Sequence, residues 1–454
     1  MALLTACGQS GSATSSIDMA CQSDETESET LSALSIENQF DFYLSQGHKK
    51  FIVKKFDSQK TMSVSEAPRK TYKVVGVEHR IQGLTNQWDV VEINSAKGVA
   101  ELKQQGNYFE QIESIEPDYP LQLGFSSSDP LVSKQWSWKQ VDSERAWDLD
   151  IGKRKVVVAV IDSGIDIRHR DLVNNIWKNS RETLNGVDDD QNGKVDDIYG
   201  WDFAHNDASP LADSKSENHG THVSGIIGAQ VNNAEGILGQ SPNVLIMPLR
   251  FIKSIGTGST SDAIRAIDYA IEKKADIINA SWGGSNYSKA LFEAVERSRK
   301  AGILFVTAAG NNGQNLETKS WYPALYPSDN ILSVAASAKD DQLTSFSNYG
   351  RSKVDVAAPG LNIFSTYNQS SYGSMSGTSM ASPLVAGLAA HVKSVNDRLD
   401  YKQIKKVILA SVDRQTFLTN KVRAGGRVNA YKAIRAANDP GFDYDLPTDK
   451  GTCP

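Results

Sequence analysis

The stretch SGTSMASPLVAGLAA, residues 376–390, is the segment around which the rest of the chain is organised. Its run of small apolar residues after Ser379 is typical of a buried helix, and Gly377 permits a tight turn just before it. Ser379 is therefore expected in the first helical turn, where backbone N–H groups lack partners and the helix dipole is positive. That position suits a nucleophile. Taken alone, however, the stretch favours an ordinary helix N-cap, so a nucleophile requires a base and an acid elsewhere.

A carboxylate ends a buried strand at residues 155–162, KVVVAVID. Six consecutive apolar residues, four of them valine, predict a strand covered on both faces, as in the centre of a parallel sheet. Open α/β sheets build their sites at the carboxyl ends of strands, so Asp162 is a candidate functional acid. The alternative is an aspartate that only begins a turn.

A histidine opens the next glycine-rich helical segment, HGTHVSGIIG at residues 219–228. His219 follows the polar loop 213–218, so its imidazole is expected at a helix entrance. His219 and His222 also have the i, i+3 spacing of a metal pair, but the sequence lacks a His-Glu-x-x-His zinc motif here. We therefore interpret His219 as a base rather than as a metal ligand.

Asp162, His219 and Ser379 follow one another in the order acid, base, nucleophile. With its flanking motifs this order resembles that of the subtilisin-like serine proteases, and the resemblance covers about residues 130–437. It implies that His219 takes the proton of Ser379 while Asp162 orients the imidazole. It also implies that Asn311 donates a hydrogen bond to the oxyanion, although an asparagine that only makes a turn is the alternative.

The same resemblance implies two backbone segments that bind extended substrate and line the pocket for the residue before the scissile bond. These substrate-binding residues are Ser281, Trp282 and Gly283 on one side and Ala308, Ala309 and Gly310 on the other. Tyr322-Pro323 resembles the cis-proline turn of the family, and Trp321 precedes it. An indole near the pocket floor would favour small or medium apolar residues; the alternative is an indole that points outward.

Strand-like and helix-like segments alternate after residue 228. We expect strands at residues 244–251, 276–281 and 303–309 and helices at residues 260–274, 287–301, 379–395 and 401–410. The alternation predicts an α/β fold, a doubly wound and mostly parallel sheet with helices on both faces. The resemblance to subtilisin-like proteases implies that residues 126–437 are the catalytic domain. An acidic tail, residues 438–454, follows this domain.

An acidic insertion, NGVDDDQNGKVDD at residues 185–197, separates Asp162 from His219. Its oxygen-bearing residues alternate around Gly193, as in an EF-hand-like loop that wraps a hard cation. The expected ligands are Asp188, Asp190, Asn192, the backbone carbonyl of Lys194, Asp196 and Asp197. Because these carboxylates would repel one another without a cation, the loop predicts Ca²⁺ as cofactor. A solvated acidic loop is the alternative, and Tyr199 stands where an EF-hand has glutamate.

Residues 36–125 have the pattern of a small α+β unit. Strand-like alternation predicts strands at residues 50–56, 88–93 and 112–119. A short helix is expected at residues 100–111. The unit resembles the inhibitory propeptide of subtilases, which assists folding and then occupies the substrate groove by its tail. We therefore expect a zymogen that cuts itself between about Leu121 and Ser128. An unrelated accessory domain is the alternative.

Residues 1–35 form a leader with a polar, Ser/Thr/Glu-rich stretch. Leu4-Thr5-Ala6-Cys7 resembles the lipobox of bacterial lipoproteins, yet six residues before Cys7 are too few for a signal peptide. Either the true start lies upstream or the match is accidental, and we expect the former. The prediction is an exported protein, extracellular or in the cell envelope, whose membrane contact is a lipid on Cys7. Cys21 and Cys453 have no assigned role.

The net charge and the hydropathy of the 454-residue chain limit the classes of partner that we expect it to bind. A formal net charge of −6 gives no reason to expect nucleic acid, and no run of eighteen apolar residues predicts a membrane span. The expected partners are protein and peptide substrates and the chain's own propeptide. An inactive subtilase-fold binding scaffold would have lost a triad residue or the oxyanion asparagine, and none is missing. A metal-dependent hydrolase using the two histidines would lose activity at once with a chelator.

Overall fold

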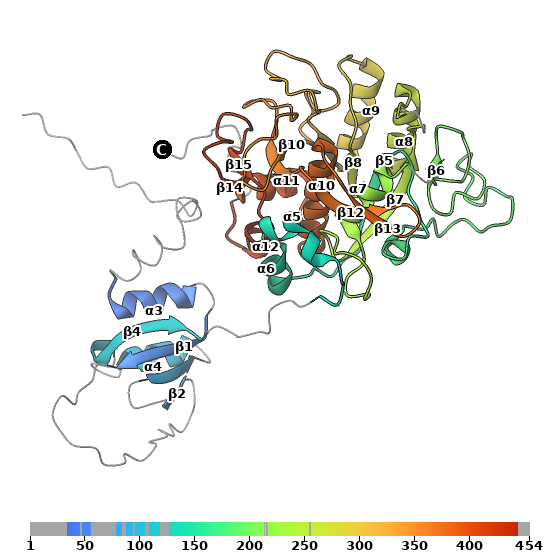
Figure 1. Ribbon diagram of the computed structural model, residues 1–454. Coiled ribbons are helices and arrows are strands. Elements are labelled where there is room, and N and C mark those ends of the chain that lie inside the picture. The colour runs from blue at the N-terminus through green and yellow to red at the C-terminus, as the bar shows by residue number, and fades with distance from the viewer. Residues whose placement is uncertain are drawn as a thin grey trace, which may run out of the picture. The chain divides into compact units, whose positions relative to one another are not determined.

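The structure, a computed structural model, describes residues 34–45, 48–55, 79–83, 88–93, 96–104, 109–118, 127–212, 214, 217–253 and 256–443. These residues form two compact units that divide between Gln122 and Leu123 (Figure 1). The predicted lipid anchor on Cys7, the two other cysteines, the tail beyond residue 443 and most of the predicted cleavage segment lie outside the described residues. Export and lipidation therefore stay predictions. Among the described residues, no helix has the length and apolar character that crossing a bilayer requires.

The N-terminal unit is an antiparallel sheet of strand order β2-β3-β1-β4 with two helices. Its elements are α3 (Ile36–Ser45), β1 (Lys50–Lys55), β2 (His79–Gly83), β3 (Trp88–Ile93), α4 (Ala96–Gln104), a 3-10 turn (Phe109–Gln111) and β4 (Ile112–Pro117). Phe40 and Phe51 are fully buried in its core, with ring centroids 4.9 Å apart. The three predicted strands are confirmed. The helix predicted at residues 100–111 instead ends at Gln104, before Gly106, a residue that disfavours helix.

The C-terminal unit is built on a nine-stranded sheet of order β14-β15-β11-β10-β9-β8-β5-β7-β6. The strands are β5 (Val156–Asp162), β6 (Trp201–Asp202), β7 (Val244–Arg250), β8 (Ile277–Ala280), β9 (Leu304–Ala308), β10 (Ile331–Ser337), β11 (Val356–Pro359), β14 (Asp413–Arg414) and β15 (Gly426–Arg427). All paired neighbours run parallel except β14 and β15. The predicted, mostly parallel sheet is confirmed.

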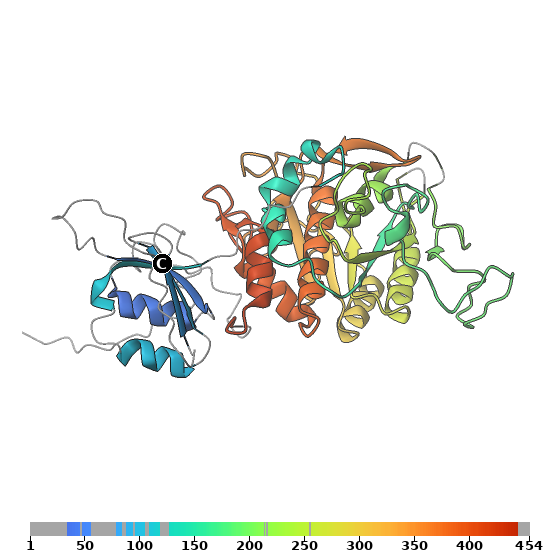
Figure 2. The same cartoon turned by 90° about the horizontal axis from the view of Figure 1, so that it is seen from below.

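Helices cover both faces of this sheet (Figures 1 and 2). They are α5 (Trp136–Gln140), α6 (Ser143–Leu149), α7 (His219–Gly228), α8 (Thr260–Glu272), α9 (Lys289–Lys300), α10 (Thr378–Val395), α11 (Tyr401–Ala410) and α12 (Ala430–Asn438), and a hairpin, β12 (Ile363–Tyr367) and β13 (Ser371–Met375), lies outside the sheet. Val158 and Val160 of β5 pack into the core with α7 and α10, whereas Ala159 and Ile161 pack into the core with α8 and α9. Each fully buried aliphatic side chain of this kind is worth about 1.5–3 kcal/mol. Because successive side chains of β5 enter one core and then the other, every position of the strand up to residue 161 is apolar.

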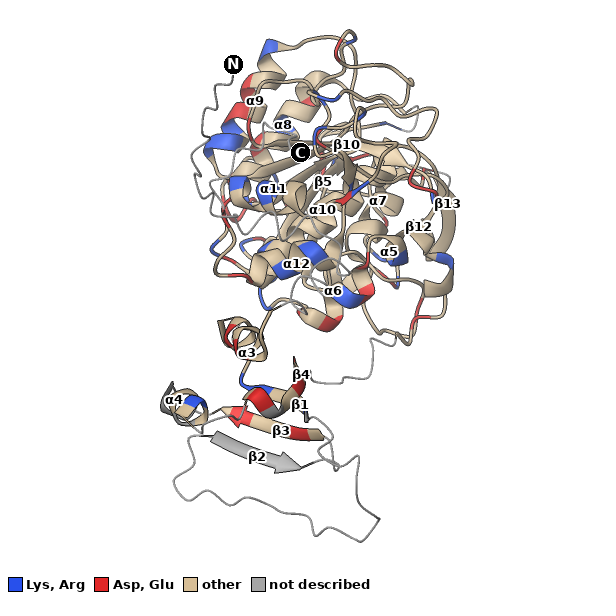
Figure 3. Cartoon of the chain, turned by 90° about the vertical axis from the view of Figure 1, so that its left-hand side faces the viewer, with Lys and Arg blue, Asp and Glu red and all other residues tan. Residues whose placement is uncertain are grey.

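Capping side chains decide where the outer helices begin. Ser259 accepts a hydrogen bond from the Asp262 N–H at 3.1 Å, which starts α8 at the predicted place. Ser288 accepts one from the Leu291 N–H at 3.2 Å, so α9 begins after it rather than at residue 287. Charges of both signs lie along α9 (Figure 3), where Arg297 pairs with Asp268 of α8 at 2.8 Å.

Three histidines among the described residues are fully buried, and two of them, His391 and His222, lie in helices that pack on the sheet. His391 of α10 contacts the Asp150 carbonyl through Nε2 at 2.6 Å, and His222 of α7 contacts the Ile363 carbonyl in the same way at 2.9 Å. Burial lowers the pKa of His391 to about 4 and that of His222 to about 3. Both rings are therefore neutral near pH 7, with the Nε2–H donating.

The sheet places one strand end at its topological switch point. The strand order reverses at β5, because β7 lies on one side of it and β8 on the other. In open α/β sheets, the carboxyl end of the strand at this reversal faces a crevice that holds the functional site. Asp162 is the last residue of β5.

Candidate active site

Asp162 and His219 meet where β5 ends and α7 begins. His219 Nδ1 lies 2.7 Å from Asp162 Oδ1, which also accepts the Ser163 N–H at 2.7 Å. A methyl group on Gly220 would lie 2.3 Å from the Gly164 carbonyl oxygen, so only glycine lets the helix begin this close to the strand. The Asp162 side chain is 1% exposed, and its carboxylate therefore holds the imidazole from a fixed position.

The environment of His219 favours its protonated form. Burial alone would lower the pKa of the imidazole, but the charge of Asp162 and the hydrogen bond to it raise that pKa above its ordinary value of about 6.5. Because Nδ1 is engaged with the carboxylate, Nε2 is the atom left to exchange a proton with a substrate or nucleophile.

Ser379 lies in the first turn of α10, beside the end of β8. Its hydroxyl donates to the Ser281 carbonyl at 3.0 Å, and the Ser281 hydroxyl donates back to the Ser379 carbonyl at 3.0 Å. Between these described residues no hydrogen bond joins Ser379 to His219, although α7 packs against α10. Catalytic hydrogen bonds of a free enzyme often form only with substrate, and a contact of this hydroxyl with the imidazole would require it to turn away from the Ser281 carbonyl.

Asn311 is fixed at the start of the same helix. Its side-chain oxygen accepts the Thr378 N–H at 2.8 Å and the Thr378 hydroxyl at 2.9 Å. The Thr378 hydroxyl in turn accepts the Gly310 N–H at 3.1 Å. Since the amide oxygen is engaged, the Asn311 NH₂ is the donor left for a ligand, and it lies 3.3 Å from where a methyl group on Gly377 would stand. The sequence pattern alone indicates no role for Thr378.

A second positioning residue, Asn279, also escaped the sequence analysis. Asn279 of β8 is fully buried, donates to the Ser281 hydroxyl at 3.0 Å and accepts from the Ser382 hydroxyl at 2.9 Å. This chain of hydrogen bonds ties β8 to α10 directly beneath Ser379. A polar residue within an otherwise apolar strand was the one signal in the sequence.

The predicted substrate-binding residues differ in exposure. Ser281 is 4% exposed, and the Trp282 indole N–H donates to the Ile161 carbonyl at 2.9 Å. On the same side, Trp282 is half-buried and Gly283 is exposed. On the predicted opposite wall, Ala308, Ala309 and Gly310 are all buried.

The Trp321 indole covers the last residue of that wall. A methyl group on Gly310 would lie 2.6 Å from Trp321 Cε2, and Ala309 belongs to a cluster against which the indole packs. The structure therefore does not expose Ala308, Ala309 and Gly310 as an open wall. The Tyr322-Pro323 peptide that follows is cis, as predicted.

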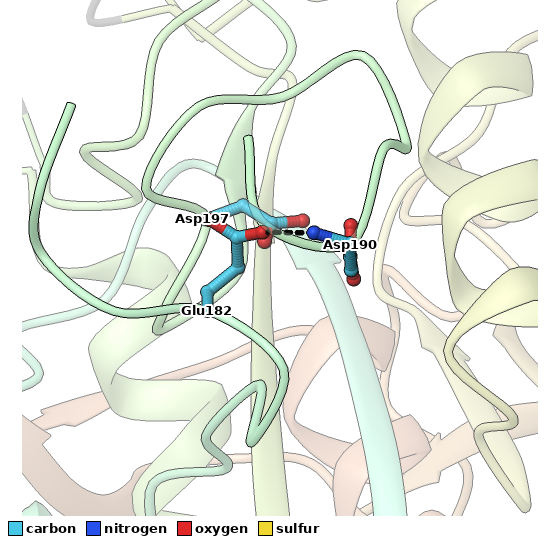
Figure 4. A group of neighbouring side chains, drawn as sticks. All are labelled: Glu182, Asp190 and Asp197. Carbon is cyan, nitrogen blue, oxygen red and sulfur yellow. Dashed lines mark hydrogen bonds between the residues drawn. The ribbon is translucent and has the colours of Figure 1, made fainter. Parts of the chain in front are cut away.

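Three carboxylates converge in the acidic insertion. Glu182, Asp190 and Asp197 each offer an oxygen within 4.8 Å of the others, and Figure 4 shows the side chains facing one another. The dashed line in Figure 4 is the hydrogen bond from the Asp190 N–H to Glu182 Oε1, at 2.9 Å. Glu182 lies outside the alternating loop, so the sequence pattern does not predict it as a ligand.

The residues of this cluster fit a divalent cation. Asp190 Oδ1 and Asn192 Oδ1 are buried and have no hydrogen-bond partner within the described part of the chain. The Lys273 ammonium, on a side chain 7% exposed, contacts Asp190 and lies 3.5 Å from Asp197. Three carboxylates and one ammonium leave two negative charges, which a hard divalent ion with oxygen ligands would neutralise.

The structure directs the other predicted ligands elsewhere. Asp188 accepts the N–H groups of Asn192 and Gly193 at 3.0 and 2.7 Å, respectively. Asp196 Oδ1 accepts the N–H groups of residues 185 and 186. For Lys194 the predicted ligand was the backbone carbonyl, which stays a prediction, while its ammonium lies over aromatic rings, 5.5 Å from that of Tyr269. The six-ligand prediction thus differs from the observed cluster, because two of its carboxylates cap turns of the loop.

Comparison with known proteins agrees with this geometry. The sequence model of the Subtilase family matches residues 153–432. Subtilisin-like protease 1 of Plasmodium vivax is 36% identical over 337 residues, which cover 70% of this chain and 53% of that protein. The chain thus spans about half the length of that relative. Thermitase of Thermoactinomyces vulgaris is 36% identical over 312 residues, which cover 68% of this chain and 100% of thermitase.

A solved structure is similar as well. It is described as proteases from Pseudoalteromonas arctica PAMC 21717, is 29% identical, and covers 69% of this chain and 100% of that chain with a TM-score of 0.58. The match to the Subtilase family covers more than half of the 454-residue chain. The chain therefore belongs to the subtilase family of serine proteases.

Proposed function

We propose that this protein is a serine endopeptidase that uses Asp162, His219 and Ser379 as its catalytic triad. The observation that carries the proposal is the 2.7 Å contact of His219 Nδ1 with the buried Asp162 carboxylate, which leaves Nε2 to act as a base. A fluorophosphonate that reacts with activated serines tests it. Labelling of the wild type but not of a Ser379→Ala variant supports the proposal, and an unlabelled wild type contradicts it.

In this mechanism, His219 Nε2 removes the hydroxyl proton as Ser379 Oγ attacks the carbonyl carbon of the scissile peptide bond. The carbonyl oxygen becomes negative and accepts hydrogen bonds from the Asn311 NH₂ and from the N–H of Ser379 at the helix start. The intermediate then collapses, the C–N bond breaks, and the leaving amine takes the proton from the imidazolium. Water repeats the same steps on the acyl-enzyme and frees Ser379.

We propose further that the N-terminal unit, within residues 36–125, is a propeptide and that the chain matures by cutting itself. The unit has its own buried core around Phe40 and Phe51 and so is able to act as a separate folding unit. The predicted cut, between about Leu121 and Ser128, follows its last strand. Its own propeptide is then the first partner of the catalytic unit, followed by protein and peptide substrates.

We also propose a structural calcium ion in the insertion. Glu182, Asp190, Asn192 and Asp197 would hold it, and the ion would supply positive charge that ties the insertion together rather than take part in catalysis.

Chelation of calcium is expected to lower the Tm of the protein by about 5 °C. A ligand present at about 100 times its Kd adds about 2.7 kcal/mol to the free energy of unfolding, and each kcal/mol moves the Tm of a large domain by about 2 °C. Calorimetry with EGTA and then with excess CaCl₂ measures this, on the Ser379→Ala variant so that self-digestion does not interfere.

Glu182→Gln should remove most of this response to calcium, whereas the matched change Asp188→Asn should preserve it, because Asp188 caps a turn outside the cluster. Equal melting with and without chelator would exclude the ion. If Asp188→Asn also lost the response to calcium, the result would support the wider set of ligands predicted from the alternating sequence.

A further inference from the structure

The side chain of the substrate residue whose carbonyl is attacked has to be accommodated beside Ser379. Its carbonyl carbon must lie beside Ser379 Oγ and its carbonyl oxygen beside the Asn311 amide. Two backbone segments lead away from these groups, one following Ser281 and the other preceding Asn311. The resemblance to subtilases implies that the side chain of that substrate residue enters the space between these two segments.

The Trp321 indole already occupies this space. A methyl group on Gly283, in the first segment, would lie 2.4 Å from Trp321 Nε1. A methyl group on Gly310, in the second, would lie 2.6 Å from Trp321 Cε2. Distances this short mean that the ring touches both backbone segments and spans the gap between them.

The indole is held in this position by the backbone beside it. The Gly284 N–H donates to the Tyr322 carbonyl at 2.9 Å, and the Tyr322 N–H donates to the Gly284 carbonyl at 2.7 Å. This pair of hydrogen bonds fixes the residue after Trp321 to the first segment. The indole N–H is buried and has no acceptor within the described part of the chain, so contact rather than a hydrogen bond keeps the ring in place.

We propose that Trp321 is a specificity-determining residue that closes the pocket for the residue before the scissile bond, so that the enzyme selects glycine, alanine or serine there. The inference rests on the proposed serine endopeptidase function. A benzyl or isobutyl side chain would meet the indole, whereas a hydrogen atom or a methyl group would remain above it. The chemical class of substrate is thus a peptide bond that follows a small residue.

Kinetics with succinyl-Ala-Ala-Pro-Xaa-p-nitroanilides, where Xaa is Ala, Leu or Phe, test this inference. Wild type should hydrolyse the Ala substrate with a kcat/KM at least about 100-fold above that of the Phe substrate, since even one misfitted methylene group is worth 10- to 200-fold. Trp321→Ala should raise the Phe-to-Ala ratio by about 100-fold. Trp321→Phe, a smaller change for which folding is less at risk, should raise the ratio for Leu by an intermediate amount.

Tyr287→Ala is the matched control. Tyr287 is 55% exposed and its ring lies 5.4 Å from that of Tyr322, so the change removes an aromatic ring nearby without opening the space between Gly283 and Gly310. Its ratio of Phe to Ala hydrolysis should equal that of wild type.

Fluorophosphonate titration, which counts active Ser379, separates the two levels of the proposal. If Ser379 is labelled and the wild type cleaves the Phe substrate as well as the Ala substrate, the inference about Trp321 is wrong while the endopeptidase function stands. An unchanged ratio in labelled Trp321→Ala and Trp321→Phe has the same meaning. If Ser379 is unlabelled and no substrate is cleaved, both the function and the inference are wrong.

Discussion

Ser379→Ala is expected to lower kcat by about a million-fold, the loss that removal of the nucleophile causes in subtilisin. Without the hydroxyl no acyl-enzyme forms, and the residual rate comes from binding and from the Asn311 amide alone. The same change should also stop maturation. Intact-mass measurement after incubation with calcium should show that the wild type loses residues up to the segment between about Leu121 and Ser128, while the variant stays whole.

Ser376→Ala is the control for this substitution. Ser376 lies three residues before Ser379 and is exposed, and among the described residues its hydroxyl contacts Asn362 alone, accepting the N–H at 2.9 Å and donating to Oδ1 at 3.4 Å. Its loss should leave both kcat and the mass of the mature protein unchanged. Cleavage of the Ser379→Ala chain at the same place, in the absence of another protease, would contradict self-processing. A wild type that stays whole but is labelled at Ser379 would contradict the propeptide assignment and leave the triad standing.

Asp162→Asn is expected to lower kcat by about 10⁴-fold and to move the acid limb of the pH profile of kcat/KM to lower pH. The activity requires neutral His219, so it falls as the pH drops through the pKa of this imidazole. Burial lowers that pKa, and the charge and hydrogen bond of Asp162 raise it by more. Because asparagine lacks the charge, the pKa falls in the variant and the residual activity persists further into acid. Rates measured from pH 5 to pH 9 give both effects.

Asp166→Asn provides a matched change outside the triad. Asp166 Oδ1 accepts the Arg168 N–H at 3.2 Å and Asp166 Oδ2 accepts the Gln369 N–H at 2.8 Å, and the single amide oxygen of asparagine keeps one of these two contacts. Its rate and its pH profile should follow those of wild type. An acid limb that stays in place in Asp162→Asn would mean that another group, and not His219, sets it.

The parts of the fold that follow from local hydrophobic pattern were predictable from the sequence. The valine run at residues 156–161 has side chains in two cores, so a strand buried on both faces was the direct interpretation. Helix α11 begins and ends at the predicted residues 401 and 410, where Asp400 forms a capping box with Gln403. Strand β10 had no prediction, because its sequence ILSVAAS mixes serine and alanine with apolar residues and it is stabilised by strands on both sides.

The position of Ser379 in the first turn of a helix was predictable from its neighbours in sequence, whereas the role proposed for Asn311 came from the resemblance to subtilases. The candidate site was not predictable where folding brings distant segments together. Glu182 joins Asp190 and Asp197 only because the insertion folds back on itself. The direction of the Trp321 indole depends on the pairing of Tyr322 with Gly284, which no local pattern contains.

The pKa values of the histidines predict that acid lowers the activity of this enzyme at a higher pH than that at which it lowers the free energy of unfolding. The pKa of His219 lies above about 6.5, so mild acid charges the catalytic base first. His391 and His222 have folded-state pKa values of about 4 and about 3, below the unfolded value. Their contribution to the free energy of unfolding is therefore complete above about pH 6.5 and declines as the pH falls toward 4. Between the pKa of His219 and about pH 6.5, the imidazole is protonated while this contribution to the free energy of unfolding is still complete. We therefore expect the activity lost in that pH range to return when the pH is raised, without refolding.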